Sequence, residues 1–221
     1  MIKAIDEIRA QMAAAAKIAK RRPGDVQLIA VSKTRSVAEI RPLFDAGQRS
    51  FGENRVAEAS DKWPALRAEF PDIDLHLIGT LQSNKAGDAV QLFDVIHSVD
   101  RESLIVALGK AIAASGKSPT CFLQVNIGGE EQKGGCAIAN IAPLLALAAQ
   151  HGVAITGLMC LPPADAEAAP YFALLAEIAA RHGLSQLSMG MSGDFATAIT
   201  LGATHVRIGT ALFGPRGAGG A

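Results

Sequence analysis

The chain of 221 residues is electrically balanced, and its composition excludes several classes of protein. Lysine plus arginine and aspartate plus glutamate number 21 each, so the formal net charge is zero. A balanced charge argues against a general nucleic-acid-binding surface and against a polybasic membrane surface. The three cysteines, Cys121, Cys136 and Cys160, are an odd number without CxxC spacing, which indicates a reducing compartment and no metal framework.

The two most apolar stretches do not have the pattern of targeting or membrane segments. Residues 1–22 carry charged side chains from Lys3 onward at short intervals, so they are not a signal peptide. Residues 134–164 contain no Asp, Glu, Lys or Arg, but Pro143 and the Gln-His-Gly at 150–152 divide them into a helix, a turn and a strand. We therefore expect a cytoplasmic protein without membrane contact.

The predicted elements alternate between strand and helix along the whole chain. An alanine-rich helix at residues 2–21 comes first and is stopped by Pro23-Gly24. Apolar, β-branched runs predict strands at 26–31, 50–51, 75–78, 95–99, 121–125, 155–158, 186–188 and 205–208. Helices are predicted at 37–46, 55–70, 84–92, 100–115, 139–150, 167–182 and 194–201, with a short one after 210.

Eight strand-and-helix units without a shift in composition predict one α/β domain with a parallel sheet. We interpret the fold as a single (β/α)8 TIM barrel, because eight such units close a barrel of this kind. An open doubly wound sheet is the alternative. The domain is expected to span residues 1–221, with an N-terminal helix within 1–22 and a flexible tail at 215–221.

The stretch LIAVSK at residues 28–33 places a lysine at the carboxyl end of an apolar predicted strand. In a barrel, this end of the strands carries the functional residues. Partial burial disfavours the charged form of an ammonium, and an uncharged lysine can condense with an aldehyde to form a Schiff base. Lys33 is therefore a candidate nucleophile. The alternative is that its ammonium only reaches past the strand to water.

Two glycine-containing loops follow the last two predicted strands and indicate a phosphate site. Gly190, Ser192 and Gly193 follow one strand, and Gly209 and Thr210 follow the other. Small residues let the backbone approach a ligand, helix starts attract anions, and these two loops are the usual phosphate site of the barrel. The alternative is that the glycines only form turns that pack helices.

A phosphate site opposite a Schiff-base lysine suggests the cofactor pyridoxal phosphate (PLP). Arg207 lies on the last predicted strand between the two, where its guanidinium can donate to the pyridine nitrogen. An arginine there keeps that nitrogen unprotonated, which weakens the cofactor as an electron sink. A role for Arg207 in an ion pair is the alternative.

Six motifs, in the same order along the chain, resemble the YggS/PROSC family of PLP homeostasis proteins. They are LIAVSKT at 28–34, FGENRVAE at 51–58, HLIGTLQSNK at 76–85, GLMCLPP at 157–163, LSMGMSGDF at 187–195 and VRIGTALFG at 206–214. Together they extend over nearly the whole chain. The resemblance implies the fold of the alanine racemase N-terminal domain, a (β/α)8 barrel that holds PLP.

The resemblance also implies roles for individual residues. Lys33 would form the Schiff base, Arg207 would lie beside the pyridine nitrogen, and Asn54 would face the cofactor ring or its hydroxyl. The residues around the phosphate would be Met191, Ser192, Gly193, Gly209 and Thr210. Gly193 stands where the family commonly has a second serine, so backbone N–H groups would replace one hydroxyl contact.

The family implies a protein that binds, buffers or delivers PLP in vitamin B6 homeostasis, without strong catalysis and without a catalytic residue. The expected partners are PLP and apo PLP-dependent enzymes, and the expected state is a monomer. The alternative is a PLP-dependent amino-acid racemase, which needs a second proton-transfer group opposite the lysine. The one tyrosine, Tyr171, is predicted on a helix outside the barrel mouth, and we expect no second domain after the last strand, so the carrier is favoured.

Residues near the predicted mouth have three alternative roles. An aldolase that uses Lys33 on a sugar phosphate fits the phosphate loops but not the motifs. Cys160 or a histidine is a further candidate for the second base, and Lys85 is a candidate for a secondary PLP site. The histidines lack the spacing of metal ligands, so no metal site is predicted.

Overall fold

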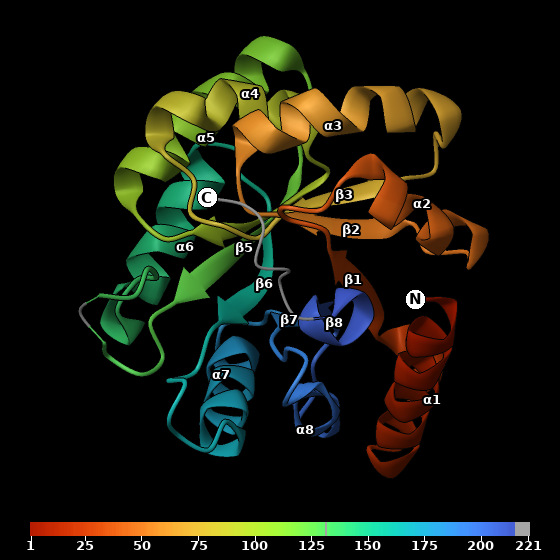
Figure 1. The fold of residues 1–221 in the computed structure, drawn as a ribbon. Coiled ribbons are helices and arrows are strands. Elements are labelled where there is room, and N and C mark those ends of the chain that lie inside the picture. The colour runs from red at the N-terminus through yellow and green to blue at the C-terminus, as the bar shows by residue number, and fades with distance from the viewer. Residues whose placement is uncertain (131, 215–221) are drawn as a thin grey trace.

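Eight parallel strands close into a barrel in the order in which they occur along the chain (Figure 1). The computed structural model describes residues 1–130 and 132–214, so the tail predicted at 215–221 lies outside the described residues. The strands are β1 Gln27–Val31, β2 Ser50–Glu53, β3 Asp74–Leu77, β4 Val95–Val99, β5 Thr120–Val125, β6 Ile155–Cys160, β7 Gln186–Ser188 and β8 His205–Ile208. Because β1 pairs with both β2 and β8, the predicted closed barrel is confirmed and the open sheet is excluded.

Helices follow the strands and surround the barrel (Figure 1). They are α2 Val37–Asp45, α3 Val56–Glu69, α4 Ala86–Leu92, α5 Glu102–Ser115, α6 Ile141–Gln150, α7 Ala169–Arg181, α8 Phe195–Thr200 and α9 Thr210–Phe213. Their bounds lie close to those predicted. In the described part of the chain, no helix combines the length and the hydropathy that a membrane span requires.

Two strands extend further at their carboxyl ends than the sequence predicted. β2 continues to Glu53, because residues 50–53 pair in register with residues 74–77 of β3. β6 continues to Cys160, which pairs with Val125 of β5. Neighbouring strands supply these hydrogen bonds, and a window of sequence does not reveal them. The extra residues carry the strand ends further into the mouth of the barrel.

The predicted N-terminal helix is confirmed as α1, Ile2–Ile18. Its buried face presents Ile5, Ile8 and Met12, spaced three and four residues apart as an amphipathic helix requires. This helix packs against α8 and α9, beside the last strand of the barrel (Figure 1). Its connection to β1 is fixed by Arg21, whose Nη1 donates to the carbonyl oxygen of Ala203 at 2.7 Å.

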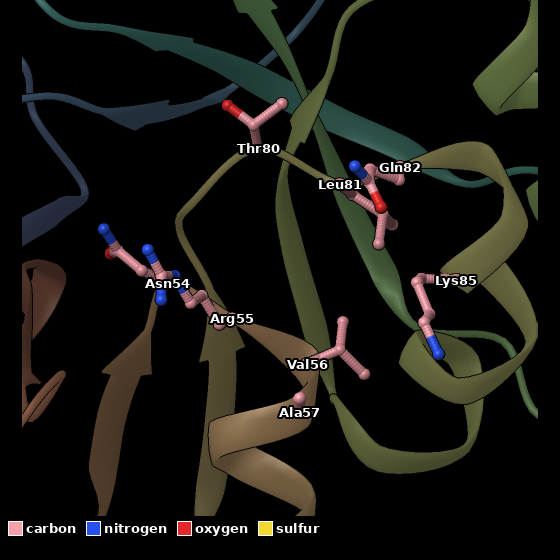
Figure 2. A pocket seen from close by; sticks show the side chains of 8 residues that line it. All are labelled: Asn54, Arg55, Val56, Ala57, Thr80, Leu81, Gln82 and Lys85. Atoms are coloured by element: carbon pink, nitrogen blue, oxygen red, sulfur yellow. The ribbon is translucent and has the colours of Figure 1, made fainter.

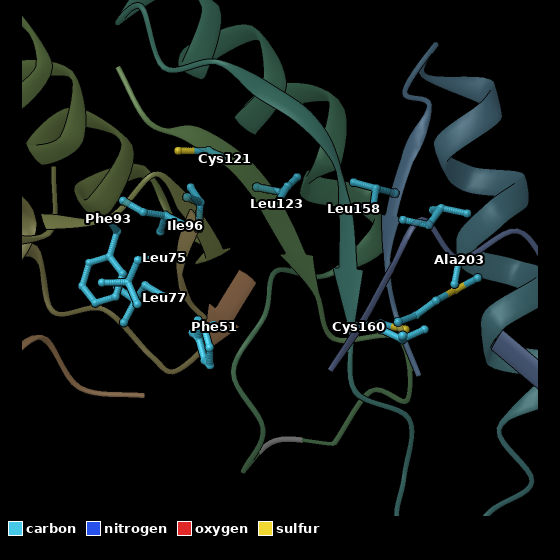
Figure 3. Packing of buried hydrophobic residues seen from close by; sticks show 14 of the residues in the cluster. Phe51, Leu75, Leu77, Phe93, Ile96, Cys121, Leu123, Leu158, Cys160 and Ala203 are labelled. Carbon is cyan, nitrogen blue, oxygen red and sulfur yellow. The ribbon is translucent and has the colours of Figure 1, made fainter. Parts of the chain in front are cut away.

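The main hydrophobic core lies between the outer faces of the strands and the inner faces of the helices. Figure 3 shows part of it, with Phe51, Leu75 and Leu77 on one side and Leu158 on the other. Trp63 of α3 is fully buried against this layer, and its ring lies 5.0 Å from that of Phe51. A parallel strand covered on both faces needs apolar side chains in continuous runs, which is the pattern that the sequence showed.

The interior of the barrel contains polar side chains as well as apolar ones. His97 of β4 stacks on Phe122 of β5 with ring centroids 4.5 Å apart. His205 of β8 meets the same phenyl ring edge-on at 5.0 Å. Burial lowers the pKa of His97 well below 6.5 and that of His205 to about 3, so both imidazoles are neutral at pH 7.

A neutral, partly buried His205 predicts a loss of stability in mild acid. Below the ordinary histidine pKa of 6.5 the unfolded chain binds a proton at this position, and the folded chain does not until the pH approaches about 3. Stability therefore falls as the pH falls through this window, by at most about 1.4 kcal/mol per pH unit for one group. Between pH 7 and pH 5 the free energy of unfolding should fall for both proteins. We expect the fall for His205→Gln to be about 2 kcal/mol smaller than for the unchanged protein.

Urea unfolding at pH 7, 6 and 5 measures this difference. The remaining titrating groups are present in both proteins, so subtracting one pH profile from the other isolates His205. Parallel profiles for the two proteins would contradict a neutral His205 in the folded chain.

Candidate functional site

A cavity of about 420 Å³ opens at the carboxyl ends of the strands. All eight residues that the sequence predicted for the site line it. They are Lys33, Asn54, Met191, Ser192, Gly193, Arg207, Gly209 and Thr210. These residues come from the segments after β1, β2 and β7 and from β8 and its following loop, which only a closed barrel brings together.

Lys33 lies two residues beyond the end of β1 and is half-buried at the cavity wall. Within residues 1–130 and 132–214 its ammonium has no hydrogen-bond or ion-pair partner, so the group is free to meet a ligand. Side chains alternate between the two faces of a strand, and Lys33 continues the inward row of Ile29 and Val31. This alternation explains why the lysine enters the mouth and does not lie under a helix.

The backbone on both sides of Lys33 is tied to the barrel by charged side chains. Ser32 donates its hydroxyl to Glu53 Oε1 at 2.7 Å, and Lys62 Nζ donates to the Ser32 carbonyl oxygen at 3.0 Å. The N–H of Thr34 donates to Glu58 Oε1 at 2.6 Å. Thr34 has a φ of +61°, a left-handed conformation that is strained for a β-branched residue and persists only where contacts hold it.

Glu53 is the most deeply buried carboxylate in this network. Its side chain is fully buried, and its Oε1 also accepts from Lys62 Nζ at 2.8 Å and from Trp63 Nε1 at 3.1 Å. Burial raises the pKa of Glu53, and Lys62 opposes that rise. The cationic partner of this carboxylate is Lys62, which lies on the inner face of α3.

The loops after β7 and β8 form the opposite side of the cavity. Ser192 Oγ accepts a hydrogen bond from the N–H of Ala211 at 3.2 Å, so the two loops are joined and the hydroxyl proton stays available to a ligand. Gly190 has a φ of +94°, and an added Cβ would lie 2.6 Å from the Cβ of Ala198. Only glycine allows the tight turn that brings Met191, Ser192 and Gly193 to the cavity.

Arg207 forms the floor of the cavity and is almost completely buried. Its Nη1 donates to Ser188 Oγ at 2.5 Å, and its Nη2 donates to the carbonyl oxygen of Cys160 at 2.9 Å. No carboxylate of the described residues forms an ion pair with it, which answers the alternative raised from the sequence. Burial lowers the pKa of Arg207, but a guanidinium remains charged in proteins. A cationic donor therefore faces the ligand space.

Asn54 lies at the wall between this cavity and a second one of about 360 Å³. Figure 2 shows the second cavity between the start of α3 and the segment after β3, with Asn54 and Arg55 on one side and Gln82 and Lys85 on the other. Gly79 touches the backbone of Asn54 so closely that a Cβ there would lie 2.3 Å from the Asn54 carbonyl oxygen. Lys85 pairs with Asp88 at 3.3 Å and does not line the cavity of Lys33.

The chain is similar to one protein family, to several curated proteins and to solved structures. The alanine racemase N-terminal domain family matches residues 4–217. A pyridoxal phosphate homeostasis protein of Pseudomonas aeruginosa is 42% identical over 96% of this chain and 94% of its own length. One of Escherichia coli K12 is 35% identical over 95% of this chain and 94% of its own length. The solved structure of PipY from Synechococcus elongatus with PLP bound has a TM-score of 0.79 and 41% identity, and the match covers 92% of this chain and 100% of PipY.

The chain belongs to the pyridoxal phosphate homeostasis protein family. The resemblance drawn from six motifs is thereby confirmed. For a member of this family, the arrangement of donors is chemically informative. A free amine lies across the cavity from hydroxyl and backbone N–H groups, with a buried guanidinium between them, and this set suits a phosphorylated ligand that carries an aldehyde.

The candidates for a second proton-transfer group are not at the cavity of this family member. Tyr171 lies on α7, outside the barrel. The Cys160 thiol is fully buried, and burial raises its pKa to about 12. His76 and His97 are also fully buried in the interior and do not line the cavity.

Sequence reasoning missed three apolar residues of the wall and the buried partners behind it. The wall residues are Val31, Ile78 and Leu161. Alternation along β1 from Lys33 back to Val31 was a signal that could have found the first of them. Lys62 and Ser188 carried no local signal, because their partners Glu53 and Arg207 meet them only in the closed barrel.

The buried Glu53–Lys62 pair predicts a large effect on stability. Lys62→Met removes the ammonium and leaves a buried carboxylate with hydroxyl and indole donors only, which we expect to cost roughly 3–5 kcal/mol in urea unfolding at pH 7. Adding Glu53→Gln to that variant should recover most of the loss. Lys85→Met, which removes an exposed pair with Asp88, is the matched control and should cost less than about 1 kcal/mol. Equal losses in the two single variants would refute the network.

The geometry of the β7–α8 loop predicts that alanine substitution will destabilise the protein at one glycine and have little effect at another. Gly190→Ala forces a side chain into a left-handed position and against Ala198, so we expect a loss of roughly 1–3 kcal/mol. Gly193→Ala meets nothing within 4 Å and has no positive φ, so its stability should change by less than about 0.5 kcal/mol. Thermal unfolding of the two variants side by side measures both, and a Gly190→Ala protein as stable as Gly193→Ala would contradict this turn.

Proposed function

We propose that this protein binds PLP in the cavity at the carboxyl ends of its strands, with the PLP aldehyde joined to Lys33 as a Schiff base. Arg207 donates to the pyridine nitrogen. The phosphate lies at Ser192, Gly193, Gly209 and Thr210, with Met191 beside it, and Asn54 faces the ring or its hydroxyl. PLP is an electron sink when bound, and the chain's own residues hold it, orient it and limit that chemistry.

One observation carries this proposal: eight residues from distant parts of the chain line one cavity of about 420 Å³. The groups fit PLP in kind. Lys33 offers an amine without a partner among the described residues, Ser192 has a hydroxyl proton to donate, and Arg207 is a buried cationic donor. PipY, which shares 41% of its residues with this chain, binds PLP in its solved structure.

We further propose that the protein acts in PLP homeostasis as a cytoplasmic monomer that buffers PLP or delivers it to apo PLP-dependent enzymes. A guanidinium cannot give up its proton to the pyridine nitrogen, so Arg207 keeps the cofactor a weak electron sink. Neither Cys160 nor Tyr171 is placed to act as a second base. Both features favour binding without strong catalysis.

The second candidate is a PLP-dependent amino-acid racemase. The observation that favours it is the match of residues 4–217 to the alanine racemase N-terminal domain family. Racemisation with two bases needs a proton-transfer group on the face of the cofactor opposite the lysine. The wall residues Val31, Ile78 and Leu161 are apolar and supply none.

Reduction of the PLP-treated protein with borohydride tests the proposed function. We expect peptide mass analysis to find one stoichiometric phosphopyridoxyl group on Lys33. Lys33→Arg should abolish this adduct, whereas Lys85→Arg should retain it fully. An adduct that stays at full yield in Lys33→Arg would contradict Lys33 as the binding lysine, and one that moves to Lys85 would establish the secondary site.

The same sample separates the carrier from the enzyme. A carrier transfers PLP to an apo PLP-dependent enzyme, and its racemase activity with alanine and other amino acids stays at the level of free PLP. Racemisation that is lost in Lys33→Arg would establish the second candidate.

A further inference from the structure

A continuous row of buried polar groups crosses the barrel interior behind Arg207. From Arg207 Nη1 it runs to Ser188 Oγ at 2.5 Å and then to His97 Nδ1 at 2.8 Å. His97 Nε2 lies 2.9 Å from His76 Nδ1, and His76 Nε2 lies 2.9 Å from Asp74 Oδ2. Because β4 and β7 are not neighbours in the barrel, the His97–Ser188 contact passes through the interior.

The chemistry of the two ends favours one direction for the hydrogen bonds of the row. A guanidinium only donates, so Ser188 Oγ accepts from Arg207 and its own proton goes to His97 Nδ1. His97 then carries its proton on Nε2 and donates to His76 Nδ1. His76 carries its proton on Nε2 and donates to Asp74, which accepts as a carboxylate. In this direction every proton in the row has an acceptor.

The opposite direction is less favourable in this structure. It would place protons on Nδ1 of both imidazoles and make His76 a cation, with the Ser188 hydroxyl proton left without an acceptor among the described residues. The charged guanidinium of Arg207 on β8 faces the same interior, so a further positive charge there would be repelled. The neutral rings avoid this repulsion and the penalty for an unpaired buried donor.

The row joins two opposite charges at opposite ends of the barrel. Arg207 lies at the cavity floor near the carboxyl end of β8, and Asp74 is the first residue of β3, at the amino-terminal end. Asp74 Oδ2 also accepts from Gln27 Nε2 at 2.6 Å, which fixes the carboxylate. Polarised hydrogen bonds in a low-dielectric interior strengthen one another, which gives a carboxylate at one end of such a row a way to act on a guanidinium at the other.

We propose that Ser188, His97, His76 and Asp74 form a one-directional hydrogen-bond relay that positions Arg207 and balances its charge for the ligand in the cavity. The ligand is the PLP of the proposed function, on which this inference rests. Ser188 and the Cys160 carbonyl oxygen each hold one terminal nitrogen of the guanidinium, so the plane of Arg207 is fixed before a ligand arrives. These residues do not line the cavity; they act through Arg207.

The direction of the relay is tested first, in the protein without PLP. Nitrogen-15 NMR of histidine-labelled protein at pH 7 reports the protonation of each ring nitrogen. We expect His76 and His97 both as neutral rings protonated on Nε2. A proton on Nδ1 of either ring, or a charged ring, would overturn the relay whether or not the protein binds PLP.

The effect of the hydrogen-bond relay on PLP binding is tested by titrating PLP into three variants. Ser188→Ala removes the link next to Arg207, and Asp74→Asn removes the charge at the far end with little change in shape. We expect each to weaken PLP binding about 3- to 10-fold and to shift the absorption band of the Lys33 adduct. Ser98→Ala is the matched control. Ser98 is next to His97 in the sequence, and its buried hydroxyl has no hydrogen-bond partner among the residues that the structure describes.

The control also separates a positioning role from a structural one. Chemical unfolding ranks the stability of the three variants, and a purely structural role would change stability without moving the absorption band. Affinity and spectrum like those of Ser98→Ala in both relay variants would overturn the proposal. If the unchanged protein forms no adduct on Lys33, the proposed function fails, and the histidine protonation still decides whether the relay exists.

Discussion

The burial of one positive charge, that of Arg207, is the constraint on which much of this barrel depends. A guanidinium cannot lose its proton to escape the cost of burial, so the surrounding structure must supply acceptors for it. β7 supplies a hydroxyl and β6 supplies a backbone carbonyl at its final residue. The hydroxyl on the inner face of β7 and the extension of β6 to Cys160 both meet this requirement.

A second group of charged side chains lies behind the cavity wall that carries Lys33. Glu53, Lys62 and Glu58 hold the backbone before and after Lys33, although none of the three lines the cavity. The lysine therefore projects from a segment whose flanking residues are fixed, while its own side chain stays free of partners in the described part of the chain. A fixed backbone with an unengaged amine suits a site that binds its ligand covalently and reversibly.

The sequence predicted the fold well because the alternation of strand and helix is a local signal that repeats eight times along this chain. It also predicted which residues meet at the mouth, since the barrel places every strand end on one rim. The partners of those residues were not predictable. Ser188, His76 and Glu53 resemble ordinary strand residues in the sequence, and their importance arises from contacts across the interior or with α3. The apolar wall at Ile78 and Leu161 was missed because both follow strands whose exact ends neighbouring strands decide.

The polar interior has a consequence for protein engineering. Barrels of this kind usually fill their centre with Val, Ile and Leu, and replacing buried polar networks by well-packed apolar residues often stabilises a protein. A redesign of this chain for heat resistance would select such replacements at His76, His97 and Ser188 first. The product would be a more stable barrel in which Arg207 had lost its hydroxyl acceptor and kept only the Cys160 carbonyl oxygen. A gain in stability would therefore come with weaker ligand binding. Thermostabilising libraries for this protein should therefore leave the centre unchanged and draw on the outer helices.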